Sequence, residues 1–188
     1  MTRPDSWQLR LARRTIDAGG IVAYPTEGVY GLGCDPLNPD AIDRLLGIKR
    51  RDAAKGFILI AAGRDQLAPY IEPLPAATEK QLAETWPGPV TWLLPAAPDV
   101  PDWLTGGRNT LAARVSAHPL VRALCDTCDQ ALISTSANLS GHPAAHSALT
   151  VRRRLGGAVD FILSGPLGGR TRPTEIRDAA TGRIVRAG

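Results

Sequence analysis

The chain has 188 residues, of which 44% are hydrophobic, and this length suits one domain with a full core. The net charge of +4 suits an anionic partner, whereas three cysteines are too few for the disulfide framework of a small secreted protein. The N-terminal segment lacks the apolar run of a signal peptide, and no apolar stretch approaches the roughly 20 residues of a membrane helix. We therefore expect a cytoplasmic protein, with residues 1–188 as a single domain and no membrane contact.

The first half of the chain alternates between helix and strand patterns. Ser6 can cap a helix that ends before Gly19, and Asn38-Pro39-Asp40 combines an N-cap, a first-turn proline and a first-turn acid. Short apolar runs predict strands. The expected strands are 21–24, 56–62 and 90–94, with helical pieces at 64–70 and 77–86 and a rigid proline turn at 86–89.

The second half continues this alternation. Strands are expected at 110–115, 131–134 and 159–163, helices at 118–125 and from a Ser147 cap to 155, and two short strands around 176 and 184–185. The glycine- and proline-rich segments 99–108 and 164–173 are predicted to be loops, the second of them mobile. The interleaving predicts an α/β fold, and its sheet should be mixed because several connections are too short for a parallel crossover.

A glycine-rich stretch at 24–33, Tyr-Pro-Thr-Glu-Gly-Val-Tyr-Gly-Leu-Gly, follows the first predicted strand. Glycines in such a loop let the backbone approach a ligand closely. Their order differs from the G-x-G-x-x-G pattern of dinucleotide-binding loops, and no helix is predicted to begin at Gly33. We interpret the stretch as the floor of a binding site.

Four cations lie within seven residues at 49–55, Lys-Arg-Arg-Asp-Ala-Ala-Lys, directly after a predicted helix. Cations at a helix C-terminus interact favourably with the helix dipole, but four exceed that need. Arginine binds phosphate oxygens in a bidentate manner and lysine acts as a mobile point charge. Arg51 and Lys55, which flank one turn, therefore suit a polyphosphate.

Polar side chains also gather at 134–141, Ser-Thr-Ser-Ala-Asn-Leu-Ser-Gly, where a predicted strand ends. Such residues often only cap a helix or form turns, but ligands of open α/β sheets bind at strand ends. We interpret this run as one wall of a site. Arg114 lies in an otherwise apolar strand, which is compatible either with a surface position or with a carboxylate-binding role.

The spacing Cys125-x2-Cys128 followed by His142-x3-His146 matches a zinc pattern. Pro143 would break the helix that should carry the two histidines. We therefore predict no metal site, and we interpret both cysteines as small hydrophobic residues on one helix.

Several motifs in a fixed order resemble those of the YrdC/TsaC family, the threonylcarbamoyl-AMP synthases. They are residues 24–34, Lys49-x-Arg51, Lys55, the Trp-Pro-Gly-Pro-Val-Thr of 86–91, Arg114-Val115 and residues 134–141. The resemblance extends from about residue 20 to Gly188 and is to the short, single-domain bacterial form. It implies a twisted mixed sheet flanked by helices, with a deep, positively charged cavity.

The resemblance also implies a nucleotidyltransferase. L-Threonine, bicarbonate and ATP, the last with Mg²⁺, would give threonylcarbamoyl-adenylate and pyrophosphate for the t6A modification of tRNAs. Downstream t6A transferase proteins would receive the adenylate, and contact with tRNA or double-stranded RNA is possible.

Residue roles follow from the same resemblance. Nucleotide binding falls to Arg51, Lys55, Thr110, Asn138 and Arg186. Lys49 would join Arg51 and Lys55 at the phosphates as the catalytic cations. Threonine binding falls to Arg114, Ser136 and Thr174. Thr26 and Tyr30 join them as the polar contacts of the floor that the stretch at 24–33 forms beside threonine.

Three positions depart from the common family pattern. Gly28 stands where a second threonine is frequent, Gly56 where proline is common, and Thr174-Glu175 where many members have Ser-Thr, which leaves the role of Glu175 open.

Two other functions also fit the sequence. One is a double-stranded RNA-binding or ribosome-assembly module, and the other is a carbamoyltransferase domain of the same fold.

Overall fold

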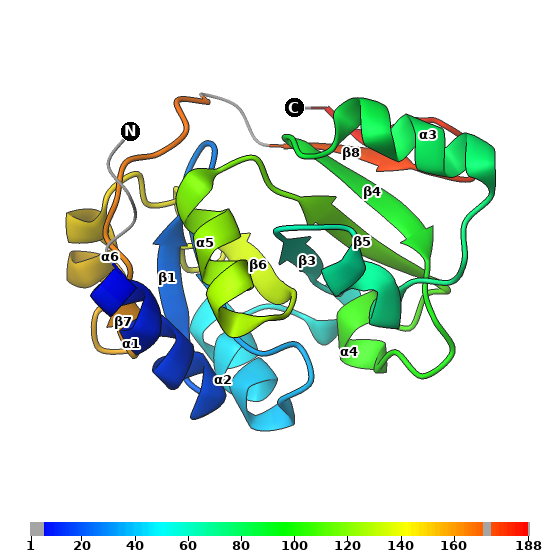
Figure 1. The fold of residues 1–188 in the computed structure, drawn as a ribbon. Coiled ribbons are helices and arrows are strands. Elements are labelled where there is room, and N and C mark those ends of the chain that lie inside the picture. The colour runs from blue at the N-terminus through cyan, green and yellow to red at the C-terminus, as the bar shows by residue number, and fades with distance from the viewer. Residues whose placement is uncertain (1–5, 171–173, 188) are drawn as a thin grey trace.

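Helices and strands alternate along the protein in the computed structural model, which describes residues 6–170 and 174–187 (Figure 1). The strands are β1 Val22–Pro25, β2 Tyr30–Gly33, β3 Ile58–Ala61, β4 Val90–Pro95, β5 Thr110–Val115, β6 Leu132–Ser136, β7 Phe161–Ile162, β8 Glu175–Asp178 and β9 Ile184–Arg186. The α-helices are α1 Ser6–Asp17, α2 Pro39–Lys49, α3 Ala76–Thr85, α4 Asp102–Thr105, α5 Pro119–Cys128 and α6 Ala148–Leu155. Two 3-10 helices, η1 Ala53–Lys55 and η2 Asp65–Tyr70, follow α2 and β3.

The strands of the described residues form one nine-stranded mixed sheet in the order β7-β1-β2-β6-β3-β5-β4-β8-β9. The pairs β1/β7, β3/β5 and β4/β8 are parallel. The pairs β1/β2, β2/β6, β3/β6, β4/β5 and β8/β9 are antiparallel. The predicted α/β class with a mixed sheet is therefore confirmed.

Helices cover both faces of the sheet, so its inner strands are buried on both sides. Successive strand residues point to opposite faces, and here they enter two different cores. The first core packs under α1 and α5, which lie side by side in Figure 1. It takes Val22, Ile60 and Leu132 from the sheet, whereas the core on the other face takes their neighbours Ala23, Leu59 and Ile133.

Helix ends follow the capping signals of the sequence. The Asn38 side chain accepts a hydrogen bond from the backbone N–H of Ala41, and Pro39 occupies the first turn of α2. At the other end, Arg50 adopts a left-handed conformation with φ 46°. Ser147 caps α6 by accepting from the N–H of Thr150. The stretch 49–55 therefore leaves α2 through a sharp turn.

Two elements differ from the sequence-based expectation. Residues 24–33 are not one loop but a β-hairpin, because Tyr30–Gly33 pairs with β1 on one side and β6 on the other. The predicted loop at 99–108 contains the short helix α4. Residues 171–173 of the predicted 164–173 loop lie outside the described residues. No described helix has the length and apolar character needed to cross a membrane.

Gly33 is the hairpin position where a side chain would do most damage. A Cβ there would collide with the carbonyl oxygen of Ile133 and lie 2.8 Å from the Tyr24 ring. A Cβ at Gly31 would meet its nearest atom, on Thr26, at an ordinary 3.4 Å. We expect Gly33→Ala to lower the free energy of unfolding by about 1–3 kcal/mol, as overpacking does in other cores.

Gly31→Ala is the matched control, since it makes the same chemical change two residues away in the same strand. Urea unfolding of both variants and the wild type measures the difference. An equal loss of stability in the two variants would contradict the packing role of Gly33.

Candidate functional site

A cavity of about 570 Å³ opens over the middle strands of the sheet. Strands β3, β5 and β6 supply its base, and the β1–β2 turn, η1 and β8 supply its sides. Six cationic side chains line it, and within the described part of the chain no aspartate or glutamate does: Arg51, Lys55, Arg108, Arg114, Arg170 and Arg186. Such a lining suits a ligand that carries several negative charges.

Most of the residues predicted for the site lie together in this cavity. From the nucleotide set, Arg51, Lys55, Thr110 and Arg186 line it. From the threonine set, Thr26, Arg114, Ser136 and Thr174 line it. These residues come from six separate segments of the chain, and the fold gathers them around one space. Their individual roles stay predictions.

Lys49 is not among the residues that line the cavity, and its direct contact with phosphates stays a prediction. Its side chain is buried, and Nζ donates to the carbonyl oxygens of Ser136 and Asn138, at 2.5 and 2.7 Å, and to Asn138 Oδ1 at 2.6 Å. Burial, followed by the charge of Arg51, lowers the pKa of Lys49 to about 8. Lys49 therefore holds the 134–141 wall in place from the buried side, away from the cavity.

Asn138 is engaged in the same way and is also absent from the described lining. Its Oδ1 accepts from Ser136 Oγ at 2.6 Å as well as from Lys49. Its Nδ2 donates to the carbonyl oxygens of Leu139 and His142. Asn138 therefore shapes the wall, where Ser136 faces the cavity, and its direct contact with the nucleotide stays a prediction.

Tyr30 is the third predicted site residue that lies outside the lining. Its side chain is 1% exposed and is not among the lining residues. Its hydroxyl donates to the carbonyl oxygen of Gly165 at 2.8 Å and accepts from the Gly165 N–H at 3.1 Å. The hydroxyl that was expected to contact threonine instead anchors the segment that follows β7.

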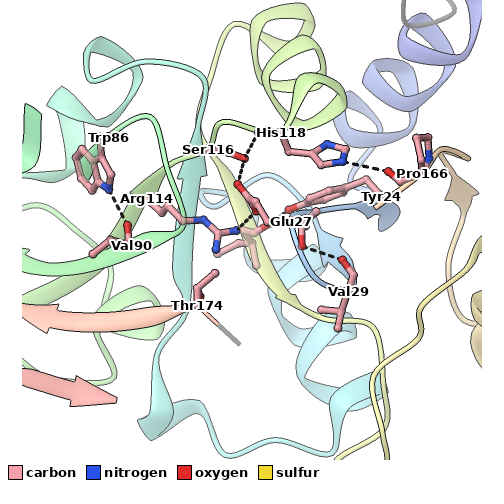
Figure 2. Close-up of polar contacts among 12 residues, drawn as sticks. Tyr24, Glu27, Val29, Trp86, Val90, Arg114, Ser116, His118, Pro166 and Thr174 are labelled. Carbon is pink, nitrogen blue, oxygen red and sulfur yellow. Dashed lines mark hydrogen bonds and ion pairs between the residues drawn. The ribbon is translucent and has the colours of Figure 1, made fainter. Parts of the chain in front are cut away.

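That segment, residues 164–170, is tied to the β1–β2 turn along its length. The N–H groups of Gly168 and Arg170 donate to the carbonyl oxygens of Thr26 and Glu27, at 3.0 and 2.9 Å. The ring nitrogen Nε2 of His118 lies 3.1 Å from the carbonyl oxygen of Pro166 (Figure 2). These bonds place Arg170 at the cavity.

Arg51 and Arg108 are neighbouring cations of the lining. Arg51 Nη2 donates to the Gly56 carbonyl oxygen at 2.9 Å, and its guanidinium lies over the Phe57 ring. Arg108 donates to the carbonyl oxygens of Ala54 and Lys55, at 2.9 and 3.0 Å. Burial and then the charges of Arg108 and Arg186 lower the pKa of Arg51. Arg108 was not predicted, because it occurs as a single cation in a glycine-rich segment.

Arg114 is buried and paired with an acid that was not predicted to be a site residue. Its Nη2 lies 3.3 Å from Glu27 Oε2, and the two side chains are only 6% and 9% exposed. Burial alone would raise the pKa of Glu27, but Arg114 and the Ser116 hydroxyl outweigh it, so that this pKa lies below its ordinary value. Figure 2 shows Thr174 beside the Arg114 guanidinium. The signal in the sequence that could have indicated Glu27 was Arg114, a charged residue in an apolar strand that needs an acidic partner.

The C-terminal strands complete the lining. Arg186 Nη2 donates to the Thr174 carbonyl oxygen at 2.8 Å. Glu175 pairs with Arg177, whose guanidinium lies over the Trp92 ring. Glu175 therefore pairs within β8, with the arginine that joins this strand to Trp92 of β4.

Cys125 and Cys128 lie buried on α5, which confirms their interpretation as small hydrophobic residues. Burial raises the pKa of both thiols, that of Cys128 to about 12. His142 and His146 are exposed.

Comparison with known proteins extends over nearly the whole chain. The model of the Sua5/YciO/YrdC family, which is described as "Telomere recombination", matches residues 14–188. A protein of Nitrosococcus oceani named threonylcarbamoyl-AMP synthase is 56% identical over 96% of this chain and 98% of its own. A protein of the same name from Halorhodospira halophila is 51% identical over 98% of this chain and 96% of its own.

A solved structure agrees with these sequence relatives. The crystal structure of P. abyssi Sua5 complexed with L-threonine matches with a TM-score of 0.92 at 32% identity. The match covers 98% of this chain and 55% of that one, so this chain spans about half of the P. abyssi protein. With a family model that covers most of its length and relatives at more than 50% identity, this chain belongs to the Sua5/YciO/YrdC family.

Proposed function

We propose that this protein is a threonylcarbamoyl-AMP synthase, a nucleotidyltransferase that joins L-threonine, bicarbonate and ATP. The observation that carries the proposal is the cavity, whose described lining has six cations and no acid, on a chain with full-length relatives of that name. Threonine and bicarbonate give the N-carboxylated amino acid and water. A carbamate oxygen then attacks the α-phosphorus of ATP, pyrophosphate leaves, and threonylcarbamoyl-adenylate remains.

Charge is the main obstacle to this reaction. The carbamate is an anion, and it must approach a triphosphate that carries several negative charges. Fixed cations lower this barrier because they stabilise the charge that is transferred to the leaving pyrophosphate. Arg51, Lys55 and Arg186 are placed to do so, with Arg108 and Arg170 as further cations of the same cavity. No side chain has to form a covalent bond, since positioning and electrostatics can supply the acceleration.

Mg²⁺ enters this scheme with ATP rather than as a resident ion. Magnesium prefers oxygen ligands, above all carboxylates and phosphates. The described lining offers no carboxylate, and no cluster of metal-binding side chains occurs among the described residues. The cavity residues therefore do not form a magnesium site of their own, and the ion belongs to the substrate.

The threonine site would lie at the Arg114 end of the cavity. Arg114 Nε is buried and has no hydrogen-bond partner among the described residues, so this arginine keeps a donor for the amino-acid carboxylate. Thr26, Ser136 and Thr174 contribute hydroxyl groups nearby. We further propose that the reaction takes place in the cytoplasm and that the adenylate passes to a t6A transferase acting on tRNA. Cations within a cavity favour a small anion over an RNA duplex, which needs an extended surface.

The first test is the release of pyrophosphate from ATP, which should require both threonine and bicarbonate. We expect Arg51→Ala and Lys55→Ala each to lower the rate by about 100-fold or more, as the loss of one transition-state donor does elsewhere. Lys80→Ala, which removes an exposed lysine from α3, is the control and should keep the wild-type rate. Thermal unfolding checks that each variant is folded.

Other results would redirect the proposal. Release without threonine would favour a carbamoyltransferase, and no release together with steeply salt-dependent duplex binding would favour an RNA-binding module. A folded Arg51→Ala variant with full activity would contradict the assignment of phosphate binding to Arg51.

The pKa of Lys49 gives a second prediction. An ordinary lysine titrates near 10.4, whereas Lys49 loses its proton at about pH 8. Above this pH its amine keeps two hydrogens for four acceptors, and the wall that carries Ser136 should loosen. We expect kcat/KM for ATP to fall above about pH 8 in the wild type, because this ratio reports the free enzyme.

Lys49→Met has no ammonium to lose, so it should show a lower kcat/KM that lacks this alkaline fall. The ratio of the two pH profiles cancels the titration of threonine itself. An unchanged alkaline fall in the variant would assign it to another group.

A further inference from the structure

The ion pair between Glu27 and Arg114 differs from every other cation contact in the cavity. Arg114 is the one lining cation of the described residues that lies within 4.0 Å of a carboxylate. The other cations of the lining are held by carbonyl oxygens or have no acidic partner in the described chain. Figure 2 shows the Glu27 carboxylate between the Arg114 guanidinium and Ser116. One arginine is therefore neutralised in a cavity that otherwise stays cationic.

Glu27 is held firmly in this position. Ser116 Oγ donates to Glu27 Oε1 at 2.6 Å, and Ser116 Oγ in turn accepts the N–H of His118 at 3.1 Å. The Glu27 carbonyl oxygen accepts the N–H of Arg170. Both ends of the residue are thus fixed, and the buried carboxylate cannot turn away from Arg114 into solvent.

The proposed function requires one cavity to hold two different anions, and the inference below rests on that function. ATP brings a polyphosphate, whereas threonine brings a single carboxylate. Six equivalent cations would bind the polyphosphate everywhere, including the place where the amino acid must lie. If one arginine bound phosphates less strongly than the other cations do, the polyphosphate of ATP and the carboxylate of threonine would bind at separate places.

We propose that Glu27 is a positioning and specificity residue that reserves Arg114 for the singly charged carboxylate of threonine. Its charge opposes the field of Arg114 and reduces it, and in a buried pair this reduction is little screened by water. Repulsion by Glu27 grows with the charge of the ligand, so pyrophosphate is repelled more than a carboxylate. The short-range hydrogen bonds of Arg114 remain, because its buried Nε–H still has no partner among the described residues.

The variant Glu27→Gln tests this directly, since it keeps the size of the side chain and its hydrogen bond with Ser116 but removes the charge. The measurement is the Kd for L-threonine, by titration calorimetry, at increasing concentrations of inorganic pyrophosphate. In the wild type we expect a change of less than about twofold. In Glu27→Gln we expect competition that weakens threonine binding by about tenfold or more at saturating pyrophosphate.

Glu79→Gln is the matched control, because Glu79 pairs with Arg64 at 3.0 Å and neither residue lines the cavity. It should behave as the wild type. A Glu27→Gln variant whose threonine Kd is independent of pyrophosphate would overturn the proposal, even if its threonine binding were weaker at every concentration. Threonine binding that is weaker by the same factor at every pyrophosphate concentration would mean that Glu27 has only a structural role.

Loss of the charge leaves Arg114 buried without a counter-ion, which can be strongly destabilising. If Glu27→Gln does not fold, the proposal is tested on the wild type. Its affinity for pyrophosphate should then be the same with and without saturating threonine. Mutual exclusion of the two in the wild type would overturn the proposal. Failure of the proposed function is a separate result: the wild type would then bind no threonine or release no pyrophosphate from ATP.

Discussion

Mutual repulsion among the cavity cations is the constraint on which the rest of the site depends. Carboxylates would relieve the repulsion, but they would also cancel the positive field that an anionic substrate needs. The protein mostly uses carbonyl oxygens instead: Arg51 donates to Gly56, Arg108 to Ala54 and Lys55, and Arg186 to Thr174. A carbonyl dipole orients a guanidinium while leaving its net charge intact. The lowered pKa values of Arg51 and Arg186, caused first by burial and then by neighbouring arginines, reflect the repulsion that remains.

The same solution explains why Lys49 is buried behind the wall. Its four acceptors include two backbone carbonyl oxygens, so the ammonium is held without a carboxylate partner. These bonds connect the end of α2 to the end of β6, two segments that are almost 90 residues apart in the chain. The lysine thereby fixes the distance between the cations that follow α2 and the hydroxyl groups of the 134–141 wall. Arg114 is the exception to this use of carbonyls, and its carboxylate partner marks the part of the cavity where a weaker field is required.

The sequence predicted those parts of the fold that local signals determine. The Asn38 and Ser147 caps define α2 and α6, and the apolar run of β5 has the bounds that were expected. Strand β2 was missed because two of its four residues are glycines, and its existence depends on pairing with β1 and β6 rather than on propensity. Residue type indicated Arg51, Lys55 and Arg114, and all three line the cavity. It could not indicate that the Lys49 and Tyr30 side chains turn away from the cavity, since their direction depends on acceptors supplied by distant segments.

The glycine-rich stretch at 24–33 acquires a different meaning from this arrangement. Gly31 leaves room for a ligand, but Gly33 leaves room for the Tyr24 ring and the neighbouring strand. The turn between the two strands carries Glu27, and its carbonyl oxygens receive the segment that brings Arg170 to the cavity. One short hairpin therefore positions two opposite charges. It carries the carboxylate of Glu27 beside Arg114, and its backbone holds the segment of the cationic Arg170. The cation is held by backbone bonds and the carboxylate by side-chain bonds, so the two charges depend on different parts of the same turn.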